Sequence, residues 1–131
     1  MGFRFCRLVG VGLLLMIGAC ELLEPSGQRY VVYFQESSAQ LMDSSRVVLT
    51  AAADRAKRHS NAAVVITSYA DPYGSQQANA GITRLRGQTV YDELVADGVP
   101  PMRIARRETG SVNFQLDSQE SRRVEISVDA P

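Results

Sequence analysis

The chain has 131 residues, with 14 basic and 14 acidic side chains and a formal net charge of zero. This length favours one globular domain, and the balanced charge argues against nucleic acid as a partner. With one histidine, no cysteine or histidine cluster at metal-ligand spacing and no G-x-S-x-G motif, we expect no metal, no cofactor and no catalytic residues.

The first residues resemble a bacterial lipoprotein signal peptide. Arginines precede residues 8–17, an apolar run of about ten residues that suits a signal peptide and is too short to span a bilayer comfortably. The run ends in Ile17-Gly18-Ala19-Cys20, which follows the order of a lipobox. This resemblance implies removal of residues 1–19 and attachment of lipid to Cys20. The alternative is an ordinary signal peptide, or an uncleaved anchor, with an incidental cysteine.

The mature chain predicted in this way begins with Cys20 and has no second cysteine for a disulfide. Glu21 follows it, whereas lipoproteins retained in the inner membrane favour Asp there, so the resemblance implies a lipid anchor on the periplasmic face of the outer membrane. Residues 20–29 include Pro25 and Gly27, show no periodicity and are predicted to be a tether. We expect the folded domain at 30–128 and a short tail at 129–131.

The first predicted elements are a strand and a helix. Residues 30–34 are aromatic and β-branched, which favours a strand. A helix is predicted to begin after Asp43 as its N-cap. Its expected core face contains Val48, Leu49, Ala52 and Ala56. The lone His59 lies near the end of this helix, where a cation suits the helix dipole, and the sequence supplies no partner for a catalytic role.

A second strand and helix follow. Residues 64–69 are apolar and β-branched and predict a buried strand, and Pro72 and Gly74 mark the turn after it. The next helix is expected to end at Gly98, with Pro100 as a stop signal. Its predicted apolar face consists of Ala78, Ile82, Leu85 and Leu94.

Two strands complete the predicted order. Residues 102–108 form a strand with a charged face, and residues 121–128 alternate so that Val124, Ile126 and Val128 face the core. The order strand, helix, strand, helix, strand, strand predicts an α+β fold, a two-layer βαβαββ sandwich. We expect parallel strand pairing across the helices, and both helices on one face of a mixed sheet.

The stretch from Ala70 to Gly87 resembles the OmpA C-terminal-like (OmpA/MotB) domain, the peptidoglycan-binding module of outer-membrane proteins and peptidoglycan-associated lipoproteins. The family signature reads roughly T-D-x-x-G-x-x-x-x-N-x-x-L-S-x-x-R-A. The matching residues here are Ala70-Asp71, Gly74, Asn79, Ile82-Thr83 and Arg86-Gly87. The resemblance extends to Tyr33-Phe34, Ser38-Ala39-Gln40-Leu41 and Arg122-Arg123-Val124-Glu125-Ile126. The chain departs from the family at Ala70, Leu85, Gly87 and Ser121.

The resemblance implies that Asp71 and Arg86 bind the diaminopimelate of the peptidoglycan stem peptide. An acid suits the ammonium of this zwitterion, and an arginine can hold its carboxylate bidentately. Asn79 would order the loop, and Arg123 keeps a position that lies near the pocket in relatives. Spacing alone favours plainer roles for two of them: a turn or helix cap for Asp71 and a solvated helix charge for Arg86. For Arg123 the equal alternative is an edge-strand charge against aggregation.

Two non-enzymatic functions follow from these predictions. The first is an outer-membrane lipoprotein that anchors the membrane to the cell wall by non-covalent binding of peptidoglycan diaminopimelate. The second is a structural lipoprotein of a secretion, conjugation or other envelope assembly, in which the domain packs on protein partners. The four departures from the family signature keep the second function open.

Overall fold

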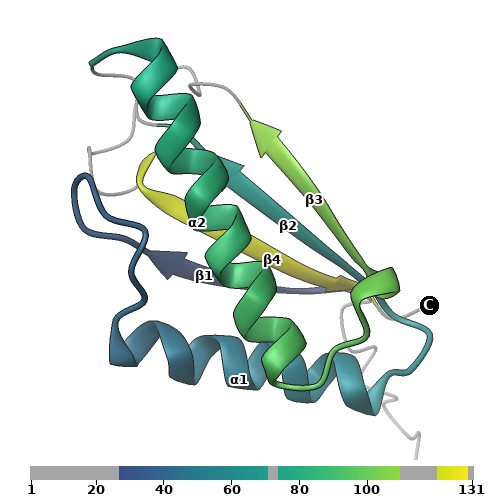
Figure 1. Cartoon of the computed structure of the whole chain (residues 1–131). Coiled ribbons are helices and arrows are strands. Elements are labelled where there is room, and N and C mark those ends of the chain that lie inside the picture. Colours follow the sequence, from purple (N-terminus) through teal and green to yellow (C-terminus); the bar gives the residue numbers. More distant parts are fainter. Residues whose placement is uncertain (1–26, 71–73, 110–120, 130–131) are drawn as a thin grey trace, which may run out of the picture.

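The computed structural model describes residues 27–70, 74–109 and 121–129, in which two helices cover one face of a four-stranded sheet (Figure 1). This arrangement confirms the predicted α+β fold and its βαβαββ order. The predicted signal peptide and the lipid site Cys20 lie outside the described residues. The elements are β1 (Gly27–Tyr33), α1 (Asp43–Arg58), β2 (Ala63–Tyr69), α2 (Gln76–Ala96), the 3₁₀ helix η1 (Pro101–Arg103), β3 (Ile104–Thr109) and β4 (Arg123–Asp129).

The strand order is β1-β4-β2-β3, which corrects one part of the predicted topology. β2 and β3 are parallel neighbours joined through α2, as expected. β1 and β2, which were also expected to pair, are separated by β4, which is antiparallel to both. The physical reason lies in β4 itself, because Val124, Ile126 and Val128 are fully buried and an inner strand gives them neighbours on both sides.

The core lies between the helices and one face of the sheet. Strand alternation places every second side chain in this layer, and the predicted inward residues of β4 are confirmed. The predicted face of α1 is also confirmed at Leu49, Ala52 and Ala56, while Val48 is partly buried. The core residues are Val32, Phe34, Leu49, Ala52, Ala53, Ala56, Ala62, Val64, Ile66, Val90, Leu94, Val99, Val124, Ile126 and Val128.

Several element boundaries differ from the predictions. Residues 27–29, expected in the tether, already belong to β1 because they pair with the end of β4. Asp43 is the first residue of α1 rather than its N-cap, which is the extended residue Met42. The backbone N–H of Arg46 donates to the Met42 carbonyl at 3.1 Å, so the helical bonding begins one residue earlier. Asp43 remains in the first turn, where its charge suits the helix dipole.

The inward face of α2 is the clearest misprediction. Leu85 is 58% exposed and Ala78 is exposed, so neither belongs to the core, whereas Leu94 does. The buried residues of this helix are Thr83, Arg86, Gly87, Val90 and Leu94. Three of these five are polar or lack a side chain, and a search for apolar residues at helical spacing therefore selects a different face. Among the described helices, none is both long and apolar enough to cross a membrane.

The end of α2 confirms the predicted role of Gly98. Gly98 has a φ of +95°, which favours glycine, and its N–H donates to the Val95 carbonyl at 3.0 Å. The N–H of Val99 donates to the Leu94 carbonyl at 3.0 Å, which completes a Schellman motif. Because Leu94 and Val99 are both buried, this turn also joins the end of the helix to the core.

Candidate functional site

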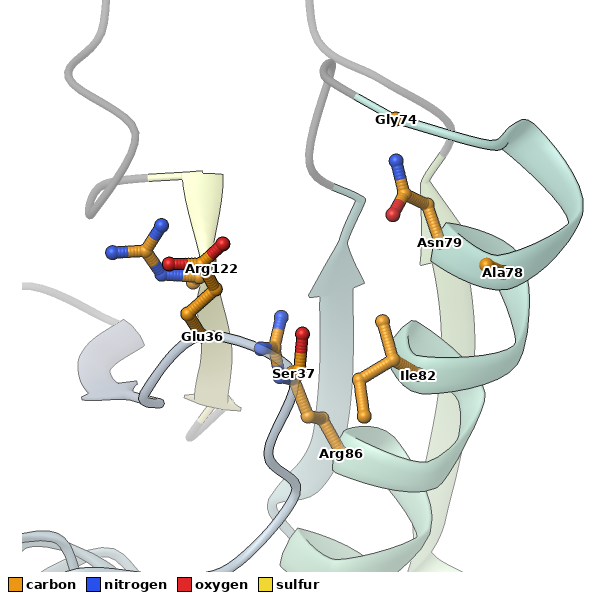
Figure 2. Close-up of a pocket in the computed structure, with 8 residues that line it drawn as sticks. All are labelled: Glu36, Ser37, Gly74, Ala78, Asn79, Ile82, Arg86 and Arg122. Atoms are coloured by element: carbon orange, nitrogen blue, oxygen red, sulfur yellow. The ribbon is translucent and has the colours of Figure 1, made fainter.

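A pocket of about 370 Å³ lies between the first turns of α2, the loop after β1 and the segment that precedes β4 (Figure 2). Its volume falls in the range of small-ligand sites. Arg86 reaches it from α2, and Arg122 lies on the side across from that helix. The residues that line the pocket are Glu36, Ser37, Gly74, Ala78, Asn79, Ile82, Arg86 and Arg122.

Arg86 is held rigidly at the wall of this pocket, although it was expected on spacing alone to be a solvated charge. The residue is only 1% exposed. Its Nε donates to the Ser38 carbonyl and its Nη2 to the Gln35 carbonyl, each at 2.9 Å. Its Cζ lies 5.4 Å from the centre of the Phe34 ring, within the range of a cation–π contact. Such contacts offset the cost of burying a charged group.

Backbone hydrogen bonds help to shape the loop after β1. The N–H of Phe34 donates to the Arg122 carbonyl at 2.9 Å, and the N–H of Ser38 donates to the Gln35 carbonyl at 3.3 Å. Ser37 between them has a φ of +50°. The carbonyls of Gln35 and Ser38 thereby face Arg86, and sequence reasoning missed them because a backbone carbonyl is present at every residue.

Asn79 lies in the pocket as the resemblance implied, beside the turn at Gly74. A Cβ on Gly74 would lie 3.8 Å from the Asn79 amide atoms, so the two residues are close neighbours. Asp71 follows Ala70 at the end of β2 and lies outside the described residues. The structure thus brings together two of the four predicted binding residues, Arg86 and Asn79.

Arg122, rather than Arg123, belongs to the described lining of the pocket. Side chains alternate along β4, so Arg122 lies on the same face as the buried Val124, and Arg123 lies on the opposite face. The alternative of an edge-strand charge for Arg123 is wrong, since β4 is an inner strand. The alternation of the last strand was visible in the sequence and was the signal that could have identified Arg122.

Arg123 takes part in a separate cluster on the sheet face that the helices leave open. Its Nε lies 2.9 Å from Oε1 of Glu125, and its Cζ lies 3.9 Å from the centre of the Tyr69 ring. The Tyr69 hydroxyl donates to Oε2 of Glu125 at 3.1 Å, and Arg29 approaches the same oxygen at 3.8 Å. Burial, followed by the charge and hydrogen bond of Glu125, raises the pKa of Tyr69, which Arg123 partly offsets.

The lone histidine has a structural position. His59 is the exposed C-cap residue of α1, and its carbonyl accepts a hydrogen bond from Nη2 of Arg103 at 2.8 Å. Within the part of the chain that the structure describes, no group of three or more His, Cys, Asp or Glu residues is placed to hold a metal ion. The pocket chemistry is therefore that of arginine, amide and carboxylate groups, which can bind a polar ligand that carries carboxylates.

Comparison with known proteins places this architecture among cell-envelope proteins. The model of the OmpA family matches residues 33–126. Outer membrane protein A of Serratia odorifera is 30% identical over 106 residues, which cover 79% of this chain and 36% of the relative. Peptidoglycan-binding protein ArfA of Mycobacterium tuberculosis is 34% identical over 103 residues, which cover 74% of this chain and 32% of the relative. The chain thus spans about a third of the length of these curated relatives.

A solved structure has the same fold. The peptidoglycan-associated lipoprotein from Burkholderia pseudomallei superposes with a TM-score of 0.69 and 22% sequence identity. The superposition covers 76% of this chain and 90% of that one. Most of that protein's structure therefore corresponds to the strands and helices found here.

Proposed function

The chain belongs to the OmpA family, as its motifs predicted, and on this premise we propose that it binds peptidoglycan through the pocket at Arg86. The family is non-catalytic, so the chain is not an enzyme, as the sequence indicated. The proposed ligand is the diaminopimelate of the stem peptide, whose side chain ends in an ammonium and a carboxylate on one carbon. ArfA, named as a peptidoglycan-binding protein, supports this choice of polymer.

The observation that carries the proposal is the fixed position of Arg86. A guanidinium has five N–H groups, of which two donate here to the carbonyls of Ser38 and Gln35. A ligand carboxylate would meet an arginine whose orientation is already determined by the loop. Preorganised charged groups bind more tightly because little side-chain freedom is lost on binding.

Asp71 is the proposed acid for the ligand ammonium, because it follows Ala70 at the end of β2 and occupies the acidic position of the family motif. Asn79 is proposed to order the turn at Gly74, which it adjoins. Arg123 stays outside this proposal, since its guanidinium lies against Tyr69 and Glu125 on the other sheet face.

The test is binding of a diaminopimelate-containing stem peptide to the wild type, Asp71→Asn, Arg86→Lys and the double variant. Charge-assisted hydrogen bonds contribute about 1.5–3 kcal/mol, so each single change should lower affinity about tenfold or more. The double variant should lose less than the sum of the single losses, because both residues hold one ligand group. A stem peptide with lysine in place of diaminopimelate lacks the second carboxylate and should bind the wild type weakly.

Arg84→Lys is the matched control for Arg86→Lys. Arg84 lies on the same helix, is 67% exposed at its side chain and approaches Glu108 at 3.5 Å, away from the pocket. This variant should keep wild-type affinity. Equal affinity of the wild type, Asp71→Asn and Arg86→Lys, each shown to be folded, would remove the pocket from the proposal and favour the assembly-component function.

The proposal extends to a lipid anchor on Cys20 in the outer membrane, which would tether the membrane to the wall. The lipobox order of residues 17–20 supports this extension. Cys20→Ala should accumulate unprocessed and without acyl label, and normal processing of that variant would contradict the proposed lipid anchor.

A second experiment tests the link to the wall. The anchored protein should co-sediment with purified peptidoglycan sacculi, and free diaminopimelate should reduce the amount that co-sediments.

A further inference from the structure

We propose that Thr83 is a positioning residue for the pocket. Its hydroxyl joins α2 to the end of β2 and thereby sets where the connection between these two elements lies relative to Arg86. Thr83 lies outside the described lining of the pocket, so it acts through its neighbours rather than by touching the ligand. The inference rests on the proposed function and adds to it a residue that determines how well the pocket is preorganised.

The link is a hydrogen bond between a helix side chain and a strand end. Oγ1 of Thr83 donates to the carbonyl of Tyr69 at 3.4 Å. Tyr69 is the last residue of β2, and Thr83 lies in the first half of α2 and is only 2% exposed. Because a buried hydroxyl without a partner is costly, this bond favours one fixed placement of α2 against the end of β2.

The bond closes a segment of chain that supplies one side of the pocket. Tyr69 and Thr83 are 14 positions apart. The described residues between them that line the pocket are Gly74, Ala78, Asn79 and Ile82 (Figure 2). Asp71, the proposed acid for the ligand ammonium, belongs to the same segment of the sequence. The Thr83 hydroxyl therefore ties together the two ends of a segment that carries several groups proposed to meet the ligand.

Arg86 lies on the same stretch of α2 as this link. It follows Thr83 by three residues, so the two are neighbours on the helix surface, and its guanidinium is held by the loop after β1. One residue further on, Gly87 lies so close to β2 that a Cβ there would be 2.6 Å from Oγ of Ser68. Thr83 and Gly87 thus fix this stretch of α2 on the end of β2, with Arg86 between them.

The proposed ligand makes this placement important. Its ammonium and carboxylate are attached to one carbon, so covalent geometry fixes the distance between the two charges. The proposed partners, Asp71 and Arg86, belong to the connection after β2 and to α2, and they must match that distance. A shift of the end of β2 against α2 would misplace one partner relative to the other, and a binding site that must first be ordered binds more weakly.

The experiment measures binding of a diaminopimelate-containing stem peptide to variants of the full chain. Thr83→Val keeps a similar shape and removes the hydroxyl, and Thr83→Ser keeps the hydroxyl. Thr89→Val is the matched control, because Thr89 lies on the same helix and its hydroxyl donates to the Leu85 carbonyl at 3.0 Å within α2. Each change is made in the wild type and in Asp71→Asn.

Thermal unfolding shows which variants are folded. Thr83→Ala replaces Thr83→Val if the latter does not fold. If neither variant folds, the hydroxyl serves the fold as a whole and the inference is overturned.

Thr83→Val should lower affinity about three- to tenfold, the factor that corresponds to one neutral hydrogen bond. Thr83→Ser should keep most of the wild-type affinity, and Thr89→Val should keep all of it. In Asp71→Asn, the change Thr83→Val should lower affinity by a clearly smaller factor, because the acid that the hydroxyl helps to position is already replaced. This dependence on Asp71 separates positioning from a general structural role.

The inference is overturned if Thr83→Val lowers affinity by the same factor with and without Asp71, or if Thr83→Ser binds as weakly as Thr83→Val. It is also overturned, with the proposed function intact, if Asp71→Asn and Arg86→Lys weaken binding while Thr83→Val binds like the wild type. Failure of the wild type to bind the peptide would overturn both.

Discussion

Arg122 and Arg123 are adjacent in the sequence, yet one lines the pocket and the other stacks on Tyr69 across the sheet. The pleat of β4 separates them, because successive side chains of a strand point to opposite faces. Two identical side chains at consecutive positions therefore belong to different parts of the molecule, one to the lining of the pocket and one to the cluster on the open sheet face.

Arg123→Gln should lower stability and leave ligand binding unchanged. The side chains of Arg123 and Glu125 are each only 14% exposed, so the loss of their ion pair and of the contact with Tyr69 should cost about 0.5–2 kcal/mol. Chemical denaturation measures the cost, and peptide binding supplies the second readout. Weaker binding at unchanged stability would instead assign Arg123 to the binding site.

Gly87 allows α2 to lie close to β2, and its replacement should reveal this. A Cβ at this position would lie 2.6 Å from Oγ of Ser68, which is itself 2% exposed. Gly87→Ala should therefore destabilise the protein by about 1–3 kcal/mol through overpacking. The double variant with Ser68→Ala removes the clash and should recover that loss, with up to about 1 kcal/mol of further gain from helix propensity. Denaturation midpoints measure the stability of each variant. The explanation is contradicted if the double variant does not recover the stability that Gly87→Ala loses.

Arg103 joins the end of α1 to the start of β2. Its guanidinium donates to the carbonyls of Ala56, His59 and Ala62 at 2.7–3.0 Å. Arg103→Ala should cost about 2–4 kcal/mol, because it removes charged hydrogen bonds to helix-terminal carbonyls. Arg103→Lys should cost less, since the charge stays while the planar fork is lost. Equal stability of Arg103→Ala and the wild type in urea unfolding would show that water replaces these bonds without cost.

Stability should fall at alkaline pH in a way that depends on Tyr69. The pKa of Tyr69 is raised in the folded protein, chiefly by burial and then by Glu125, above the unfolded value near 10. Between these two values the folded chain keeps a proton that the unfolded chain has lost. The contribution of Tyr69 to stability is therefore complete below the unfolded pKa and disappears as the pH rises through the folded pKa.

Tyr69→Phe should make the decline of unfolding free energy above pH 10 shallower. Glu125→Gln should have the same effect, because it removes the carboxylate that contributes to the raised pKa. The measurement is urea unfolding from pH 8 to pH 11. A decline of equal slope in the wild type and in Tyr69→Phe would assign the alkaline loss to other groups.

Local patterns in the sequence predicted the local structure well. Alternation identified the inward residues of β4, β-branched residues located β2, and Gly98 marked the end of α2. The helix face of α2 was mispredicted because its buried side includes Thr83, Arg86 and Gly87, whose reasons for burial lie in other elements. Thr83 donates to the Tyr69 carbonyl, and Gly87 lies against Ser68.

The sequence by itself determined the order of elements, the family and the presence of Arg86 and Asn79 in the candidate site, because these depend on residue type and short spacing. Only the tertiary structure decided that β4 lies between β1 and β2. Only it showed that the carbonyls of Gln35 and Ser38 hold Arg86, across 51 and 48 positions of chain. Strand pairing and backbone carbonyls act over long sequence separations and leave no mark in residue type, so the pattern of side chains does not reveal them.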